Sequence, residues 1–201
     1  WKTYLGRPEA DAVRCDAMTA LGNALCESRP KEALPVLEDT VVFFRRLGKH
    51  SILNPNFDSL AICYGKLGRH KEAVRVQRKV YEAILRHHGA ENLETIRAVN
   101  NLSHFLNNKG SFAEVLELTS QYGPIAKRVL GADRLTYILL TWNRARALQG
   151  RGGSRADIIA AVSLLEDALQ RTTRVFGPQH PRTRDNTERL ENARMGLEEC
   201  L

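Results

Sequence analysis

The sequence lacks the features that mark several common classes of protein. No apolar run approaches the roughly 20 residues that a membrane-spanning helix requires. No run of Lys and Arg is longer than two, and the aromatic residues, 6% of the 201 residues, are not interleaved with basic ones. Proteins that bind single strands of nucleic acid combine a basic groove with such aromatic rings. These absences argue against a transmembrane segment and against nucleic-acid binding.

Catalytic and metal-binding motifs are also missing. The sequence has no HExxH motif, no His or Cys pair with zinc-site spacing, and no candidate pair of nucleophile and base. The loop Gly150–Ser154 lacks the GK[ST] ending of a phosphate-binding loop. We therefore predict no enzyme activity, no metal and no cofactor. The four cysteines form no CxxC pair, and free thiols without a recognisable signal peptide predict a reducing, cytoplasmic location.

The overall composition predicts a folded protein with a basic surface. Hydrophobic residues make up 43% and charged residues 26%, which is enough apolar material for a core. The net charge is +7, and after residue 40 the chain has 25 Lys and Arg against 16 Asp and Glu. A basic protein of this kind favours acidic partners.

A repeat of 42 residues organises the middle of the chain. Apolar residues recur at intervals of three and four, the period of an α-helix, and glycines separate the helical segments. Leucine to glycine is eight residues in two successive segments, glycine to the next apolar landmark is five, and the closing glycine follows 16 later. The landmarks of the first segment are Leu60, Gly68, Ala73 and Gly89, and those of the second are Leu102, Gly110, Val115 and Gly131.

This pattern resembles the tetratricopeptide repeat, in the long form found in kinesin light chains and their relatives. The small or short residues Ala61, Ser103, Ala73, Val115 and Ala161 and the junctions "RVLGADRLT" and "RVFGPQHPRT" carry the resemblance. It implies an all-α fold, a right-handed superhelix of stacked antiparallel helix pairs. We expect a single array over residues 1–201, with units at 9–48, 54–89, 93–131 and 135–177 and a polar capping helix at 181–200.

Two residues depart from the repeat. Pro124 lies inside the second helix of the third unit, where it removes a backbone hydrogen bond. We expect a kink there, or a split into two short helices. Arg144 stands at the position that Leu60 and Leu102 occupy in earlier units. Both departures favour a role as an assembly or regulatory subunit over peptide binding in a regular groove.

The resemblance also implies which residues bind a partner. In the family, an asparagine before the landmark leucine holds the backbone of an extended peptide on the concave face, and the matching positions here are Ser59, Asn101, Asn143 and Arg189. An amide side chain can both donate to and accept from a peptide backbone. Basic and polar residues lie three and four positions away on the same helical face. The predicted peptide-binding groove consists of Arg97, Asn100, Asn101, His104, Asn108, Asn143 and Arg146.

Two hypotheses of function remain open. The first is a cytoplasmic, non-catalytic scaffold or adaptor that binds an acidic or extended protein segment in its concave groove. The second is an assembly or regulatory subunit of a larger complex, which contacts its partners through its convex face and end helices. Nucleic-acid binding through the basic surface is a third and weaker alternative.

Overall fold

The computed structural model describes residues 12–46, 56–150 and 152–198, and every regular element in these ranges is an α-helix. The all-α class is therefore confirmed. The outer limits predicted for the first unit, the start of the second and the last residues of the capping helix lie outside the described residues. The described helices are α1 (Ala12–Ser28), α2 (Pro30–Arg46), α3 (Asn56–Lys66), α4 (His70–His88), α5 (Leu93–Lys109), α6 (Phe112–Leu130), α7 (Leu135–Gly150), α8 (Arg155–Phe176) and α9 (Pro181–Glu198).

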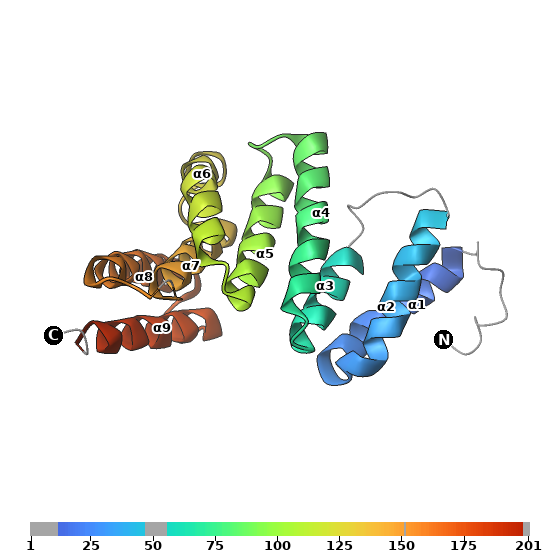
Figure 1. Ribbon diagram of the computed structural model, residues 1–201. Coiled ribbons are helices and arrows are strands. Elements are labelled where there is room, and N and C mark those ends of the chain that lie inside the picture. The colour runs from blue at the N-terminus through green and yellow to red at the C-terminus, as the bar shows by residue number, and fades with distance from the viewer. Residues whose placement is uncertain (1–11, 47–55, 151, 199–201) are drawn as a thin grey trace. The chain divides into compact units, whose positions relative to one another are not determined.

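The chain divides into two compact parts, residues 1–87 and 88–201. In the first part α1 packs on α2, and both contact α3. In the second part each helix from α5 to α9 packs on the next one, and α5 also contacts α7. Figure 1 shows α1 beside α2 and α8 beside α9. The helices lie within the predicted repeat units, whereas the grouping of those units into one array remains a prediction.

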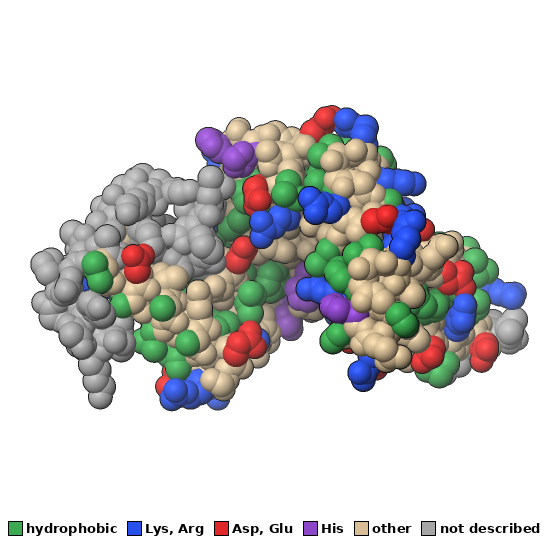
Figure 2. Space-filling view, turned by 180° about the vertical axis from the view of Figure 1, so that it is seen from behind, with side chains coloured by type: hydrophobic (Ala, Val, Ile, Leu, Met, Phe, Trp, Pro, Cys, Tyr) green, Lys and Arg blue, Asp and Glu red, His purple; other side chains and the backbone are tan. Residues whose placement is uncertain are grey.

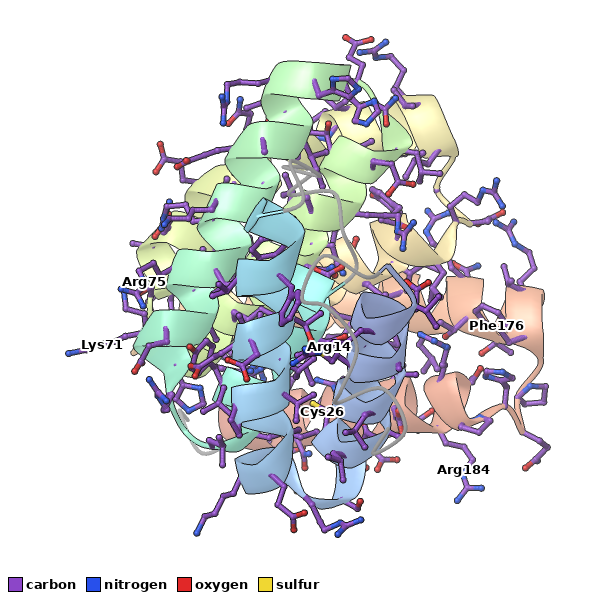
Figure 3. The ribbon with its side chains drawn as sticks, turned by 90° about the vertical axis from the view of Figure 1, so that its right-hand side faces the viewer. Arg14, Cys26, Lys71, Arg75, Phe176 and Arg184 are labelled. Atoms are coloured by element: carbon purple, nitrogen blue, oxygen red, sulfur yellow. The ribbon has the colours of Figure 1, made fainter. Side chains whose placement is uncertain are left out.

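In the N-terminal part, polar contacts between helices surround a buried sulfur pair. The Cys26 thiol donates to the Ser59 carbonyl (3.8 Å) and the Cys63 thiol to the Pro30 carbonyl (3.1 Å). Burial raises the pKa of Cys63 to about 11, so this thiol stays protonated at neutral pH. In Figure 3 Cys26 lies among the helices, whereas Lys71 and Arg75 project outward from α4.

Glycines recur at the ends of helices with a spacing of 21 residues, half of the 42-residue repeat. Five glycines with positive φ follow one another at intervals of 21 residues, and the next comes after the loop insertion that precedes α8. Glycine reaches this region of backbone space without the strain that a Cβ brings, so it lets the chain turn from one helix to the next. These glycines are Gly68, Gly89, Gly110, Gly131, Gly152 and Gly177.

The junction between repeats uses the same hydrogen bond twice. The hydroxyl of Thr95 donates to the carbonyl of Gly89 (2.6 Å), and that of Thr183 donates to the carbonyl of Gly177 (2.8 Å). In each pair the threonine follows the glycine by six residues. This bond fixes the direction in which α5 and α9 begin.

Small residues occupy buried positions in the helices, as the resemblance implies. Each of the five positions that carry it, Ala61, Ala73, Ser103, Val115 and Ala161, has a fully buried side chain. Small side chains let helices approach closely, and the larger residues around them then fill the remaining space. In the C-terminal part a cluster of buried apolar residues joins α7, α8 and α9.

The helix α6 does not split at its proline, so of the two expected outcomes the split into two short helices is wrong, whereas the kink remains a prediction. It continues from Phe112 to Leu130 with Pro124 inside it. Buried side chains lie on both sides of the proline, with Tyr122 1% and Ala126 0% exposed. Their burial stabilises the helical backbone on either side, which outweighs the one hydrogen bond that proline cannot form.

Gly22 provides a test of the packing between α1 and α2. A Cβ at this position would lie 2.6 Å from Cδ2 of Leu37, a side chain with no exposure that cannot move away cheaply. We expect Gly22→Ala to destabilise this helix pair by about 1–3 kcal/mol, measured as faster hydrogen exchange in α1 and α2. The matched control is Gly123→Ala in α6, where a Cβ meets nothing within 4 Å. Equal protection of α1 and α2 in wild type and Gly22→Ala would contradict this packing.

Candidate functional site

The predicted groove residues belong to two neighbouring helices, α5 and α7, and the structure separates them into three groups. Arg97 is exposed and forms an ion pair with Glu94, one turn earlier on α5 (3.1 Å). It takes no part in the contacts between α5 and α7 described below. Its charge is therefore already balanced on its own helix.

The second group is a network of asparagine amides between α5 and α7. The amide nitrogen of Asn143 donates to the side-chain oxygen of Asn100 (3.0 Å) and to its backbone carbonyl (3.2 Å). In turn the amide nitrogen of Asn107 donates to the backbone carbonyl of Asn143 (3.0 Å) and to its side-chain oxygen (3.3 Å). Asn143 is only 9% exposed and Asn107 only 3%. The amide of Asn143 is thus used inside the protein.

Asn101 differs from Asn143, although both occupy the same position in the repeat. Its side chain is half-buried, and its oxygen accepts a long hydrogen bond of 3.4 Å from the amide of Asn100. Within the described chain no other side-chain hydrogen bond involves Asn101. Its amide nitrogen can therefore donate to a bound chain.

The third group is a chain of polar contacts from α7 to α5. Arg146 donates to the side-chain oxygen of Asn108 (2.9 Å), and the amide nitrogen of Asn108 lies 3.2 Å from Nε2 of His104. His104 and Arg146 both keep contact with solvent. This contact chain brings three of the predicted residues together on one accessible surface.

A further basic residue, Arg189 of α9, joins this surface. Its guanidinium lies 5.5 Å from the centre of the Trp142 ring, a distance at which a cation and an aromatic face attract each other. Trp142 itself packs against the buried cluster of α7, α8 and α9. Sequence reasoning placed Arg189 at the position equivalent to Asn101 but gave it no role, and that equivalence was the available signal.

The electrostatics of the surface follow from two arginines lying close to a histidine. Partial burial lowers the pKa of His104, and the charges of Arg146 and Arg189 lower it further. Burial and the charge of Arg189 also lower the pKa of Arg146. No carboxylate is among the groups that shift either pKa. We call His104, Asn108, Arg146 and Arg189 the basic cluster.

Other kinds of site were sought in the described part of the chain. No group of three or more His, Cys, Asp or Glu side chains there could hold a metal ion. None of the helices in the described ranges is long and apolar enough to cross a membrane.

Comparisons with known proteins agree with the helix arrangement. Residues 153–182, which include α8 and its junction with α9, match the family model described as tetratricopeptide repeat. The chain carries a tetratricopeptide repeat. No curated protein sequence matches the chain.

Solved structures show the same repeat fold. The chain is similar to a kinesin light chain from Podosopora anserina with nearly identical TPR-like repeats, with a TM-score of 0.71 and 20% identity over 96% of this chain and 93% of that one. A variant of that protein gives a TM-score of 0.72 and 21% identity, covering 93% and 91%. BtubC (BKLC) from P. vanneervenii gives 0.69 and 16%, covering 94% and 78%. The expected all-α fold of tetratricopeptide-like helix pairs is thereby confirmed.

The asparagine network of this repeat protein can be tested by removing its central member. In Asn143→Ala the Asn107 amide keeps only its bond to the backbone carbonyl of residue 143, and both oxygens of Asn100 lose the donor that the Asn143 side chain supplied. Leaving such polar groups without a partner costs about 1–3 kcal/mol. We expect α5 and α7 to lose that much protection against hydrogen exchange. Asn101→Ala, a matched control with the same change in helix propensity, should stay near the wild type. A similar loss in both variants would show that the network does not hold these helices.

The charge environment of the basic cluster can be measured at His104. Its pKa, followed by NMR of the imidazole ring, should lie below the ordinary value of 6.5. Because the charge of Arg146 disfavours the protonated ring, Arg146→Gln should raise this pKa. Arg184→Gln on α9, which removes an exposed charge absent from the causes of the His104 shift, is the control. A pKa at or above 6.5 in the wild type would refute the described cluster.

Proposed function

We propose that this protein is a non-catalytic scaffold that binds an acidic, extended segment of a partner protein on the accessible surface of α5, α7 and α9. The observation that carries the proposal is the basic cluster. Two arginines and a histidine gather there, and burial together with the charges of neighbouring arginines lowers the pKa of His104 and that of Arg146. The repeat fold supports a role in protein–protein interaction, because stacked helix pairs form extended binding surfaces.

Other arginines of the C-terminal part have carboxylate partners within the protein. Arg128 pairs with Glu91 (2.6 Å), Arg171 with Asp167 (2.7 Å) and Arg194 with Glu166 (2.7 Å). The hydrogen bond of Arg146 instead goes to a neutral amide, that of Asn108. A carboxylate brought by a partner would form charge-assisted hydrogen bonds with this arginine. It would also reduce the repulsion between the neighbouring cations.

The second requirement for the proposed ligand is an extended backbone. Asn101 presents an amide nitrogen that the described chain leaves without an acceptor, and peptide carbonyls are acceptors at regular spacing along a strand. This amide would contact the backbone of the segment, whereas the basic cluster would contact its acidic side chains. Asn100 and Asn143 would then act as positioning residues, since they hold α5 and α7 together.

One observation favours the assembly-subunit alternative. Large apolar side chains are exposed on the described helices outside the basic cluster, with Ile159 50% and Val175 44% exposed on α8. Such residues can contribute to an interface with another protein. Binding of nucleic acid finds no such support, because in Figure 2 basic and acidic side chains alternate over the coloured surface. The free thiols of Cys26 and Cys63 support the proposed reducing, cytoplasmic compartment.

The proposal is tested with a fluorescently labelled peptide in which Glu alternates with Gly, and with the same peptide carrying Gln for Glu. Fluorescence anisotropy should show binding of the acidic peptide only. Arg146→Gln combined with Arg189→Gln should weaken that binding about tenfold or more, since each charged hydrogen bond contributes roughly 1–3 kcal/mol.

The matched control is a double variant, Arg182→Gln with Arg184→Gln, which removes the same charge from α9 at residues that are not part of the basic cluster. It should lower affinity only slightly, through long-range attraction that salt screens. Equal losses in the two double variants would mean that net charge, and not the cluster, binds the peptide. Equal affinity for the Glu and Gln peptides would exclude an acidic ligand.

A further inference from the structure

A second candidate site lies among α6, α7 and α8. These helices surround a pocket of about 470 Å³, within the range of roughly 300–1,000 Å³ typical of ligand sites. Apolar groups from two helices line it, with Tyr137 and Leu140 from α7 and Leu164 from α8. Both departures from the repeat, Pro124 and Arg144, also line this pocket. We call it the α6–α8 pocket.

The sequence of α6 keeps one wall of the pocket open. Gly123 has no side chain, and a Cβ built there would meet nothing within 4 Å. Pro124 has no N–H to donate to the carbonyl of Ser120, one turn earlier in the helix. The Gly-Pro pair therefore supplies both the space and a carbonyl without its usual helical donor.

The charged side chains that line the pocket are all positive. Arg144 donates from Nη1 to the hydroxyl of Ser120 (2.7 Å), and Lys127 is exposed at the wall formed by α6. The ten residues that line the pocket include these two cations and no Asp or Glu. Neither cation has an ion pair in the described part of the chain. The pocket thus combines an apolar interior with a positive potential.

We propose that the α6–α8 pocket binds an apolar side chain of a partner protein together with a carboxylate close to it in the same segment. The apolar group would lie against Leu140, Leu164 and the Tyr137 ring, and the carboxylate would lie between Arg144 and Lys127. This site does not depend on the basic cluster. Arg144 and Arg146 are two residues apart on α7, so they point to nearly opposite sides of the helix.

Such a ligand would match the pocket both in apolar surface and in charge. An anion without an apolar group would leave the apolar lining in water, and an apolar group without a charge would leave two cations without a partner. The carboxylate can come from the C-terminus of the partner or from an acidic side chain next to the apolar residue. Two probes separate these sources.

The experiment uses the full chain, labelled with ¹⁵N, and follows the backbone amides of Gly123, Lys127 and Thr141 by NMR. The probes are N-acetyl-leucine, which imitates a C-terminal residue, and N-acetyl-leucyl-glutamic acid α-amide, which keeps an acidic side chain after the leucine and has no free C-terminal carboxylate. Acetate and N-acetyl-leucinamide are the controls that lack the apolar group and the charge. We expect at least one of the two probes to shift these amides saturably, and both controls to shift them much less.

Two variants show whether the shifts come from the pocket. Gly123→Leu fills the open wall and should abolish them, and Lys127→Gln removes an exposed charge and should weaken binding about twofold to fivefold. Lys109→Gln on α5 and Arg146→Gln, whose residues do not line the pocket, should have no effect. The proposal is overturned if neither probe exceeds the controls. It also fails if Gly123→Leu and Lys127→Gln both bind as the wild type does.

Discussion

The hydrogen bonds that join α5 to α7 through Asn100, Asn107 and Asn143 are the constraint on which the candidate site depends. Amide side chains bond in defined directions, so this network fixes how the two helices lie along each other. A buried polar network favours one arrangement over its alternatives, because a shift would leave the bonded amide groups without partners. The contact between Arg146 and Asn108 exists because this arrangement places them opposite one another.

The network separates a structural function from a binding function on adjacent faces of the same helices. Asn143 faces the inside of the pair and contributes to stability, whereas Arg146 and His104 reach solvent and Arg146 carries a positive charge. The ion pairs of Arg128, Arg171 and Arg194 balance much of the remaining charge locally. The basic cluster is therefore a local concentration of positive charge, which is the property that an acidic partner would recognise.

The fold could be predicted from the sequence because the same pattern of helix pairs recurs in successive repeats. The helix period, the glycine spacing and the small residues Ala61 and Ser103 all indicate the same helix pairs, and the structure agrees with each. The capping box of Ser154 and Asp157 at the start of α8 is another local signal, since these two residues lie three apart in the chain. Local signals of this kind depend on residues near one another in the chain, so a single sequence contains them.

The site could be predicted only in part, because its properties depend on contacts between repeats. Asn101 and Asn143 are equivalent in sequence, yet only Asn143 has Asn107 and Asn100 as partners across the helix pair. The position of Arg189 beside Trp142 depends on how α9 packs. Pro124 suggested a broken helix because its own cost is local, whereas the burial of Tyr122 and Ala126 that offsets this cost is tertiary.

The central claim is that the basic cluster is where an acidic segment binds. The most direct measurement is NMR mapping of the full chain with an unlabelled peptide of alternating Glu and Gly, which lacks the apolar group that the α6–α8 pocket requires. The account predicts shifts centred on Asn108, Arg146 and Arg189, with a rise in the pKa of His104 as a carboxylate approaches it. Shifts centred on other helices, with the pKa of His104 unchanged, would contradict it.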